Sequence, residues 1–147
     1  MPENPDDRIP VGDPAVRLAV AVGRINRRIR PTGDGLSHGL MSALSTIVRQ
    51  GPIRPSELAR IEAVAAPTAT RAVADLETRG LIERTADPED GRSSLLTATR
   101  DGVTAVIHAR LERAERVAAL LETLTDEQRA AVWGALEALE AAAGIRQ

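Results

Sequence analysis

The sequence contains no cysteine and no lysine, and Trp133 is its only residue from the group Phe, Tyr and Trp. Without cysteine, the chain offers no disulfide, no thiolate nucleophile and no cysteine-based metal site. Without lysine, it lacks the phosphate-binding loop that ends in Gly-Lys-Ser/Thr. With one aromatic ring in this group, it also lacks a platform on which single-stranded nucleic acid stacks its bases. These absences exclude thiol chemistry and argue against nucleotide hydrolysis and single-strand binding.

Long apolar runs are missing too, since none approaches the roughly 18 residues of a membrane-spanning helix. The amino-terminal stretch MPENPDDRIPVGDP is rich in proline and acidic residues, unlike a secretory signal, and it reads as a frayed tail. We therefore expect no membrane partner and a cytoplasmic location. The 147 residues have the length of one domain, and we expect residues 1–147 to form a single domain.

The charge is nearly balanced, because 19 arginines face 21 acidic residues and leave a net charge of −2. Residues 1–30 have a small basic excess, residues 101–147 have an acidic excess, and residues 49–100 are neutral. A surface for duplex DNA would therefore be an arginine-rich face on a neutral region. The charge permits DNA binding without indicating it.

The apolar residues, 43% of the chain, are mostly Ala, Leu and Val, which favours helices. A first helix is predicted to begin with Asp13 as its N-cap and Pro14 in its first turn, and to end before Pro31 in the loop PTGDG. Its apolar positions recur at helical spacing: Leu18, Val22, Ile25 and Ile29. This pattern predicts one buried face.

A second helix is predicted to begin after Ser37 as its N-cap and to end near Gly51. Two short helices follow, PSELARIE and PTATRAVADLETRG, with only AVAA between them. Ser56 is the predicted N-cap of the first, and Pro67 and Gly80 mark the start and end of the second. This spacing is typical of a helix-turn-helix.

The stretch GLIERTADPEDGRSSLLTATRDG, residues 80–102, predicts a β-hairpin. Two apolar pairs, at 81–82 and 95–96, flank the turn signal Asp90-Gly91, and Arg92 follows at the tip. A calcium loop is not predicted, because its acidic residues lack the alternating spacing of an EF-hand. The simplest alternative is a solvated turn without a ligand.

After Gly102 the helical period resumes to the end of the chain and predicts two helices joined at TLTDEQ. Thr125 followed by Gln128 fits a capping box at the start of the second. Both helices have more apolar positions than packing against the rest of a single chain would require. We therefore expect this region to form a helical interface with a second copy of the chain.

The order of these elements, and above all the stretch PTATRAVADLETRGLIERTADPEDGRSSLLTATRDG, resembles the multiple antibiotic resistance regulator (MarR) family of bacterial transcription factors. The resemblance covers roughly residues 13–143. It implies a mainly α (α+β) fold, a winged helix-turn-helix over residues 36–100, and dimerisation helices over residues 13–30 and 101–147. It also implies a homodimeric regulator, a repressor that binds double-stranded DNA at a pseudo-palindromic operator.

Several residues of this region are expected to contact DNA. Thr68, Thr70 and Arg71 lie at the start of the helix that would enter the major groove, and Arg71 alone among them can bind guanine bidentately. Arg92 would enter the minor groove from the wing. Asp90 resembles the family's wing aspartate, which implies that it pairs with the Arg92 side chain and fixes its guanidinium.

Arg54, Ser56 and Arg84 complete the predicted DNA-binding set. Arg54 and Arg84 would grip backbone phosphates or simply be solvated. Three other positions depart from the family pattern. Ala65 stands where a capping Ser is common, Ala63 where the turn has Gly, and Glu62 where the residue is often apolar; loss of a Ser cap costs about 1 kcal/mol.

The resemblance further implies a small-molecule effector, often aromatic or anionic, bound between the dimerisation helices and the DNA-binding lobe. Arg27, Arg28 and His38 are the predicted polar groups of its pocket. No cofactor is predicted. No metal is predicted either, since His38 and His108 stand alone without cysteine.

An enzyme is not expected. Asp34, Ser37 and His38 lie close in sequence but lack the nucleophile elbow of a hydrolase. The alternative to a DNA-binding regulator is a winged-helix module that binds other proteins and not DNA. The neutral charge of residues 49–100 is the observation in its favour.

Overall fold

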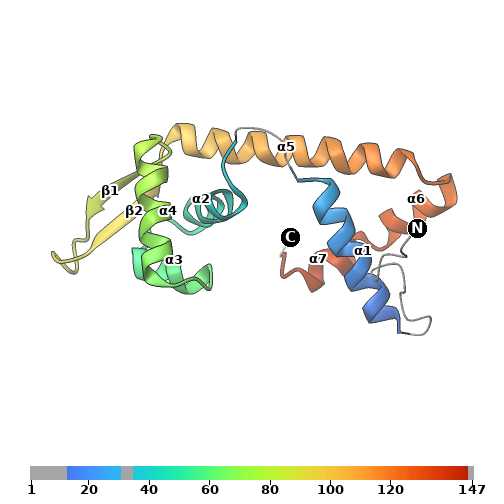
Figure 1. Cartoon of the computed structure of the whole chain (residues 1–147), viewed down its shortest axis with the longest axis horizontal. Coiled ribbons are helices and arrows are strands. Elements are labelled where there is room, and N and C mark those ends of the chain that lie inside the picture. Colours follow the sequence, from blue (N-terminus) through green and yellow to red (C-terminus); the bar gives the residue numbers. More distant parts are fainter. Residues whose placement is uncertain (1–12, 31–34, 146–147) are drawn as a thin grey trace, which may run out of the picture. The chain divides into compact units, whose positions relative to one another are not determined.

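The structure, a computed structural model, describes residues 13–30 and 35–145, so the predicted tail over residues 1–12 and most of the loop PTGDG lie outside the described residues. The elements in chain order are α1 (Pro14–Arg28), α2 (His38–Gln50), α3 (Pro55–Ile61), α4 (Ala66–Thr78), β1 (Ile82–Ala86), β2 (Ser94–Ala98), α5 (Arg100–Glu122), α6 (Asp126–Gly134) and α7 (Leu136–Ala142) (Figure 1). The predicted mainly helical class with one hairpin is confirmed.

The chain divides into two compact units. The first comprises Met1–Arg30 with Arg113–Gln147, and the second comprises Pro31–Glu112. Helix α5 is continuous and contributes residues to both. The predicted DNA-binding lobe, residues 36–100, lies inside the second unit. The expected single domain over the whole chain stays a prediction.

Side-chain capping explains the start of α2 but not that of α3. Ser37 caps α2, because its Oγ accepts the N–H of Leu40 at 3.3 Å, as predicted. The predicted cap Ser56 is wrong, because Arg54 is the N-cap of α3 and Ser56 lies within its first turn. Pro55 takes the first helical position, where its missing N–H costs nothing, and this places the start of α3 two residues before a Ser56 cap would.

The turn between α3 and α4 holds all three departures from the family pattern, Glu62, Ala63 and Ala65. Ala63 has a φ of +53°, a left-handed conformation that favours glycine. Ala65 is the N-cap of α4 and provides no side-chain hydrogen bond. Helix α4 nevertheless forms, with Pro67 in its first turn and Gly80, at a φ of +69°, just beyond its end, as predicted.

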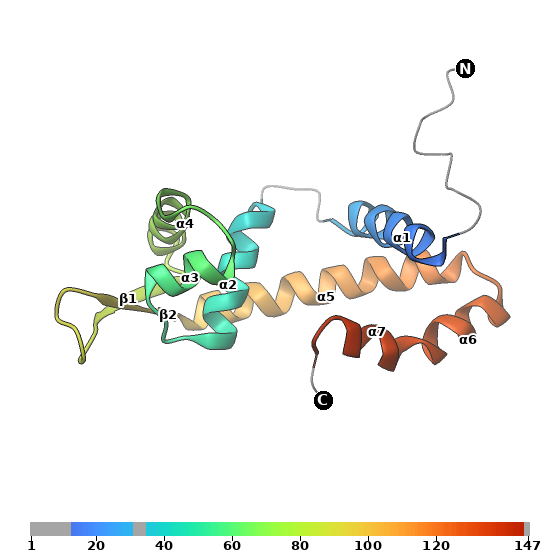
Figure 2. The same cartoon turned by 90° about the horizontal axis from the view of Figure 1, so that it is seen from below.

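The predicted hairpin is confirmed as an antiparallel pair that runs from Ile82 opposite Ala98 to Ala86 opposite Ser94. Ile53 adds a short bridge, since its N–H donates to the Leu96 carbonyl at 3.2 Å. Figures 1 and 2 show the hairpin extending beyond α3 and α4, with the connection between β1 and β2 at its tip. The bridge attaches the base of this wing to the segment before α3.

The core of the second unit draws large apolar side chains from every one of its elements. Each of these side chains is at most 5% exposed: Leu44, Ile47, Ile53, Leu58, Val73, Leu76, Ile82, Leu96 and Val106. Full burial of such a side chain contributes roughly 1.5–3 kcal/mol. The helix-turn-helix and the base of the wing therefore share one hydrophobic core.

Helix α5 begins at Arg100, three residues before the predicted start just after Gly102. Thr99 explains this start, because its Oγ1 accepts the N–H of Gly102 at 3.1 Å and donates to the Gly80 carbonyl at 2.7 Å. Gly102 is buried, and a Cβ there would clash with the Leu81 carbonyl oxygen. The absent side chain lets α5 pack against the segment that leads into β1.

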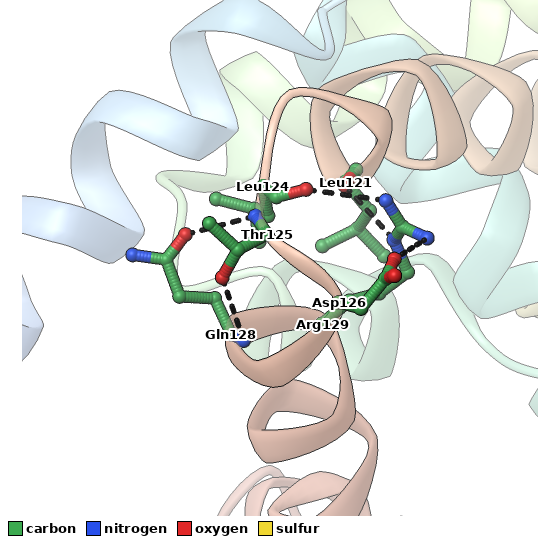
Figure 3. Close-up of polar contacts among 6 residues, drawn as sticks. All are labelled: Leu121, Leu124, Thr125, Asp126, Gln128 and Arg129. Atoms are coloured by element: carbon green, nitrogen blue, oxygen red, sulfur yellow. Dashed lines mark hydrogen bonds and ion pairs between the residues drawn. The ribbon is translucent and has the colours of Figure 1, made fainter.

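In the first unit, Asp13 caps α1 as predicted, accepting the N–H of Ala15 at 2.8 Å. The capping box of α6 is also confirmed, with bonds of 3.0 and 3.2 Å between Thr125 and Gln128 (Figure 3). Arg129 donates to the carbonyl of Leu121 in α5, to that of Leu124 just after α5, and to the Asp126 carboxylate (Figure 3). The two predicted carboxy-terminal helices are three, because the last one breaks at Ala135, just after Gly134, a weak helix former.

The first unit leaves most of its large apolar side chains uncovered. In its described part Ile29 is the one buried hydrophobic residue, although the predicted stripe of α1 also included Leu18, Val22 and Ile25. At least 36% of the surface is exposed in the following side chains: Val16, Leu18, Val22, Ile25, Trp133, Leu136, Leu139 and Ile145. The described helices also include none with the length and apolar character of a membrane span.

Candidate nucleic-acid interface

Helix α4 turns one face to the core and the other to solvent. Ala69 and Val73 are buried, whereas Thr68, Thr70 and Arg71 are exposed on its first two turns. The Thr70 hydroxyl donates to the Ala66 carbonyl at 2.9 Å, so its oxygen is left as an acceptor. The three predicted contact residues of α4 are therefore all accessible on its first two turns.

The guanidinium of Arg71 has no hydrogen bond or ion pair with any residue that the structure describes. Its five N–H donors are therefore available to a ligand. Arg79, at the other end of α4, differs because its Nε lies 2.7 Å from Asp75 Oδ1. Among the arginines of α4 and its cap, Arg71 is the one placed to bind an outside group.

The wing is held by the buried carboxylate of Asp87, a residue for which the sequence indicated no functional role. Asp87 Oδ2 accepts from Arg54 Nε at 2.6 Å, and the Asp87 side chain is 2% exposed. Its Oδ1 accepts the N–H of Glu89 at 2.9 Å, and Glu89 Oε2 lies 3.6 Å from Arg54 NH2. The hydrogen bond from Arg54, followed by the backbone N–H of Glu89, lowers the pKa of Asp87.

This contact, the Arg54–Asp87 clasp, changes the interpretation of Arg54. Its guanidinium is directed at Asp87 and Glu89 and not left for phosphate alone. Because the two partners lie 33 positions apart, no local spacing indicates the pair. Arg54 positions the wing relative to α3, and its predicted phosphate contact stays a prediction.

The predicted pairing between the side chains of Asp90 and Arg92 is wrong. Asp90 Oδ1 accepts the backbone N–H of Arg92 at 3.1 Å, and the Asp90 carbonyl accepts the N–H of Ser93 at 2.8 Å. An Asp carboxylate readily accepts a hydrogen bond from the backbone N–H two residues later, and this local turn competes with an ion pair to the Arg92 guanidinium. Asp90 therefore shapes the tip of the wing.

Arg92 itself is exposed at the end of the hairpin, with no side-chain partner in the described part of the chain. Arg84, by contrast, is engaged. Its Nε lies 3.0 Å from Glu77 Oε2 of α4, and its NH1 lies 3.5 Å from Ser94 Oγ. Arg84 braces the wing against α4, and Arg92 remains the available cation at the tip.

The position of Glu62 also has a structural explanation that its sequence did not indicate. Its two carboxylate oxygens accept hydrogen bonds of 2.6 Å each, from Ser42 Oγ and from Thr46 Oγ1. Thr46 is buried, and Arg49 NH2 lies 3.4 Å from its Oγ1. A polar Glu62 is therefore accommodated because α2 supplies two hydroxyl donors.

The predicted effector residues fall in different units. Arg27 and Arg28 form the last turn of α1 in the first unit, and His38 opens α2 in the second and is exposed. Their joint role in one pocket stays a prediction. Among the described residues, no three His, Asp or Glu side chains are grouped as metal ligands would be.

Comparison with known proteins places this geometry in a family. The MarR family model matches residues 36–94, which span the helix-turn-helix and most of the hairpin. The HTH-type transcriptional regulator Mb0904 of Mycobacterium bovis is 36% identical over 114 residues, which cover 76% of this chain and 80% of that protein.

Solved structures agree with this match. The transcriptional regulator Tm0710 of Thermotoga maritima aligns with a TM-score of 0.71 at 26% identity, over 86% of this chain and 90% of its own. A variant of S. aureus MepR, solved bound to an oligodeoxyribonucleotide, shares the fold with a TM-score of 0.64 at 15% identity, over 87% and 96% of the two chains. With its winged helix-turn-helix, the chain belongs to the MarR family of HTH-type transcriptional regulators.

Proposed function

We propose that this regulator binds double-stranded DNA sequence-specifically as a homodimer and acts as a repressor in the cytoplasm. The observation that carries the proposal is the contrast among the arginines of the second unit. Arg54 and Arg84 are used to hold the wing, whereas Arg71 and Arg92 are exposed without partners among the described residues. These two sit on the two elements that a winged helix-turn-helix presents to DNA.

Helix α4 is the proposed recognition helix. The major groove of B-form DNA admits a helix, and Arg71 on the exposed second turn can donate two parallel hydrogen bonds to the O6 and N7 of guanine. Thr68 and Thr70 are short enough to contact phosphate or base edges beside it. Arg71 would then supply base specificity and the threonines would supply register.

The wing is proposed to contact the minor groove. A narrow, A·T-rich minor groove concentrates negative potential and attracts an inserted arginine. The Arg54–Asp87 clasp and the Arg84–Glu77 ion pair limit how far the hairpin moves relative to α3 and α4. Arg92 would therefore approach DNA from a wing that is already positioned, which lowers the entropic cost of the contact.

A homodimer is supported by the uncovered apolar side chains of the first unit. Large apolar side chains exposed in such numbers usually mark a protein interface, and none of the described helices is long and apolar enough to span a membrane. A twofold dimer would place two copies of α4 about 34 Å apart, one turn of the duplex, and would read a pseudo-palindrome. The proposed dimerisation helices are those over residues 13–30 and 101–147.

A small effector is also proposed, with Arg27, Arg28 and His38 as its polar contacts. An aromatic acid would suit these groups, because two of them are permanent cations. The proposal involves no catalysis and no cofactor.

The test is selection of bound duplexes from a random pool, followed by fluorescence anisotropy titrations at two salt concentrations. We expect one enriched pseudo-palindrome, with an affinity that falls steeply as salt rises. Arg71→Ala should cost about 1–3 kcal/mol at one base pair of each half-site. Arg79→Ala, which removes a paired arginine at the far end of α4, is the matched control and should change affinity little.

The alternative function, a winged-helix module that binds only proteins, predicts a different outcome. No sequence would then be enriched, and Arg71→Ala and Arg92→Ala would leave the weak binding to duplex unchanged. Either result would reject the proposed DNA-binding surface.

A further inference from the structure

A cavity of about 250 Å³ lies in the second unit, between the start of α2, the end of α3 and the first turns of α4. Its wall is mostly apolar, with Leu40, Ala43, Leu58 and Ala72 among its members. The volume is close to the lower end of the range for small-molecule pockets, roughly 300–1,000 Å³. The cavity therefore has room for a small molecule with one ring.

This mostly apolar cavity contains one negatively charged side chain. Among the described residues that line it, Glu62 is the only charged one, and the polar remainder includes the hydroxyls of Ser37 and Thr68. No arginine of the described chain forms an ion pair with Glu62. The cavity therefore holds a half-buried negative charge without an ion-pair partner, and Arg49 reaches it only through the hydroxyl of Thr46.

The hydrogen bonds of Glu62 leave it free to bind more. A carboxylate has about four lone-pair positions, and the hydroxyls of Ser42 and Thr46 occupy two of them. Those two bonds also fix the direction of the carboxylate, so it does not have to be reoriented by a ligand. Charge-assisted hydrogen bonds to a cationic donor are the strong ones in such a setting.

We propose that this cavity binds a small organic cation, an apolar ring that carries an amine or amidine group. The cationic N–H groups donate to the Glu62 carboxylate, and the ring packs on Leu40, Leu58 and Ala72. An anion of the same shape is repelled by Glu62. The site uses none of Arg27, Arg28 and His38, and its occupation does not require that the protein binds DNA.

The test uses the full-length protein and three probes of nearly equal shape: benzamidinium, neutral benzamide and anionic benzoate. Isothermal titration should rank them in that order of affinity. Glu62→Gln removes the charge and keeps a side-chain oxygen for a hydroxyl donor, so it should reduce benzamidinium affinity about tenfold and leave benzamide affinity nearly unchanged. Glu57→Gln, on an exposed position of α3 outside the cavity, is the matched control and should have no effect.

A second variant tests the location independently of the charge. Ala72→Leu fills the cavity and leaves the Glu62 hydrogen bonds in place, so all three probes should lose affinity, with circular dichroism confirming the fold. Three results would overturn the proposal: no binding of benzamidinium, equal affinity for benzoate, or unchanged binding in the Ala72→Leu protein. Because the readout is probe binding, failure here is distinct from failure of the DNA-binding proposal.

Discussion

The buried carboxylate of Asp87 lies 2.6 Å from the Nε of Arg54, and this contact joins the wing to the residue that precedes α3. Asp87 follows β1 directly, and its backbone N–H also donates to the Ser93 carbonyl at 3.2 Å, across the end of the hairpin. The position of the wing relative to the helix-turn-helix therefore depends in part on one buried carboxylate and one guanidinium, beside the Arg84–Glu77 ion pair. It also depends on the protonation state of that carboxylate.

We predict that this clasp is lost in acid. The pKa of Asp87 is lowered in the folded protein, chiefly by the hydrogen bond from Arg54, so its stabilising effect is complete above the ordinary carboxyl value of 3.8 and disappears as the pH falls through the lowered value. Urea titrations should show that Asp87→Asn is less stable than the parent at pH 7. This difference should shrink towards pH 3.

The exposed pair of Asp75 and Arg79 provides the control for the clasp. Asp75→Asn removes a carboxylate that is 43% exposed, and such surface pairs contribute at most about 1 kcal/mol. An Asp87→Asn difference that stayed constant down to pH 3 would show that the charge of Asp87 does not stabilise the wing.

Gly102→Ala is predicted to destabilise the second unit by about 1–3 kcal/mol, because the new Cβ meets the Leu81 carbonyl oxygen, which belongs to the backbone. The free energy of unfolding from urea titration measures this cost. Gly39→Ala, in α2, is the control, since no atom lies within 4 Å of its Cβ position. That variant should be stabilised by roughly 0.5–1 kcal/mol, the usual helical preference for alanine. Equal effects at both positions would mean that α5 does not approach Leu81 this closely.

The left-handed conformation of Ala63 leads to a stabilising prediction. Ala63→Gly should remove a strain of about 1–2 kcal/mol, partly offset by the greater freedom of glycine in the unfolded chain. A rise of a few degrees in Tm is the expected result. If Ala63→Gly instead lowered Tm, the turn between α3 and α4 would have a different backbone conformation.

The exposed stripe of α1 predicts how the dimer can be broken. Leu18 is 54% exposed. In a twofold dimer that uses α1, the Leu18 side chain of each chain should be buried in the interface, so two copies of it are buried per dimer. Leu18→Arg is therefore expected to weaken dimerisation about a hundredfold or more, since each buried leucine contributes roughly 1.5–3 kcal/mol. Light scattering over a concentration series measures the dimer dissociation constant of each variant. Ala74→Arg, on an exposed position of α4, should leave the dimer intact.

Local signals in the sequence predicted most of the elements. Asp13, Ser37 and Thr125 are caps in the structure, because a capping hydroxyl or carboxylate acts on a helix start only two or three residues away. The predicted cap at Ser56 was wrong, because the neighbouring Pro55 takes the first helical position and so makes Arg54 the N-cap. The break at Ala135 also escaped prediction, since the apolar period continues through it.

The residues that position the wing and the helix-turn-helix were harder to predict than the exposed arginines of the proposed DNA-binding surface. Arg71 and Arg92 follow from a helix start and a turn tip, which are local features. Asp87 with Arg54, and Glu62 with Ser42 and Thr46, are pairs separated by 16 or more positions and depend on how the elements pack. Their roles became visible only with the distances between the elements.

The decisive measurement is the mass of the protein–DNA complex, by sedimentation equilibrium with a duplex selected from the random pool. Two copies of α4 and two wings on one operator require two chains per duplex, formed in one cooperative step. A complex of one chain per duplex, or a protein that sediments as a single chain and selects no sequence, would contradict the proposed function.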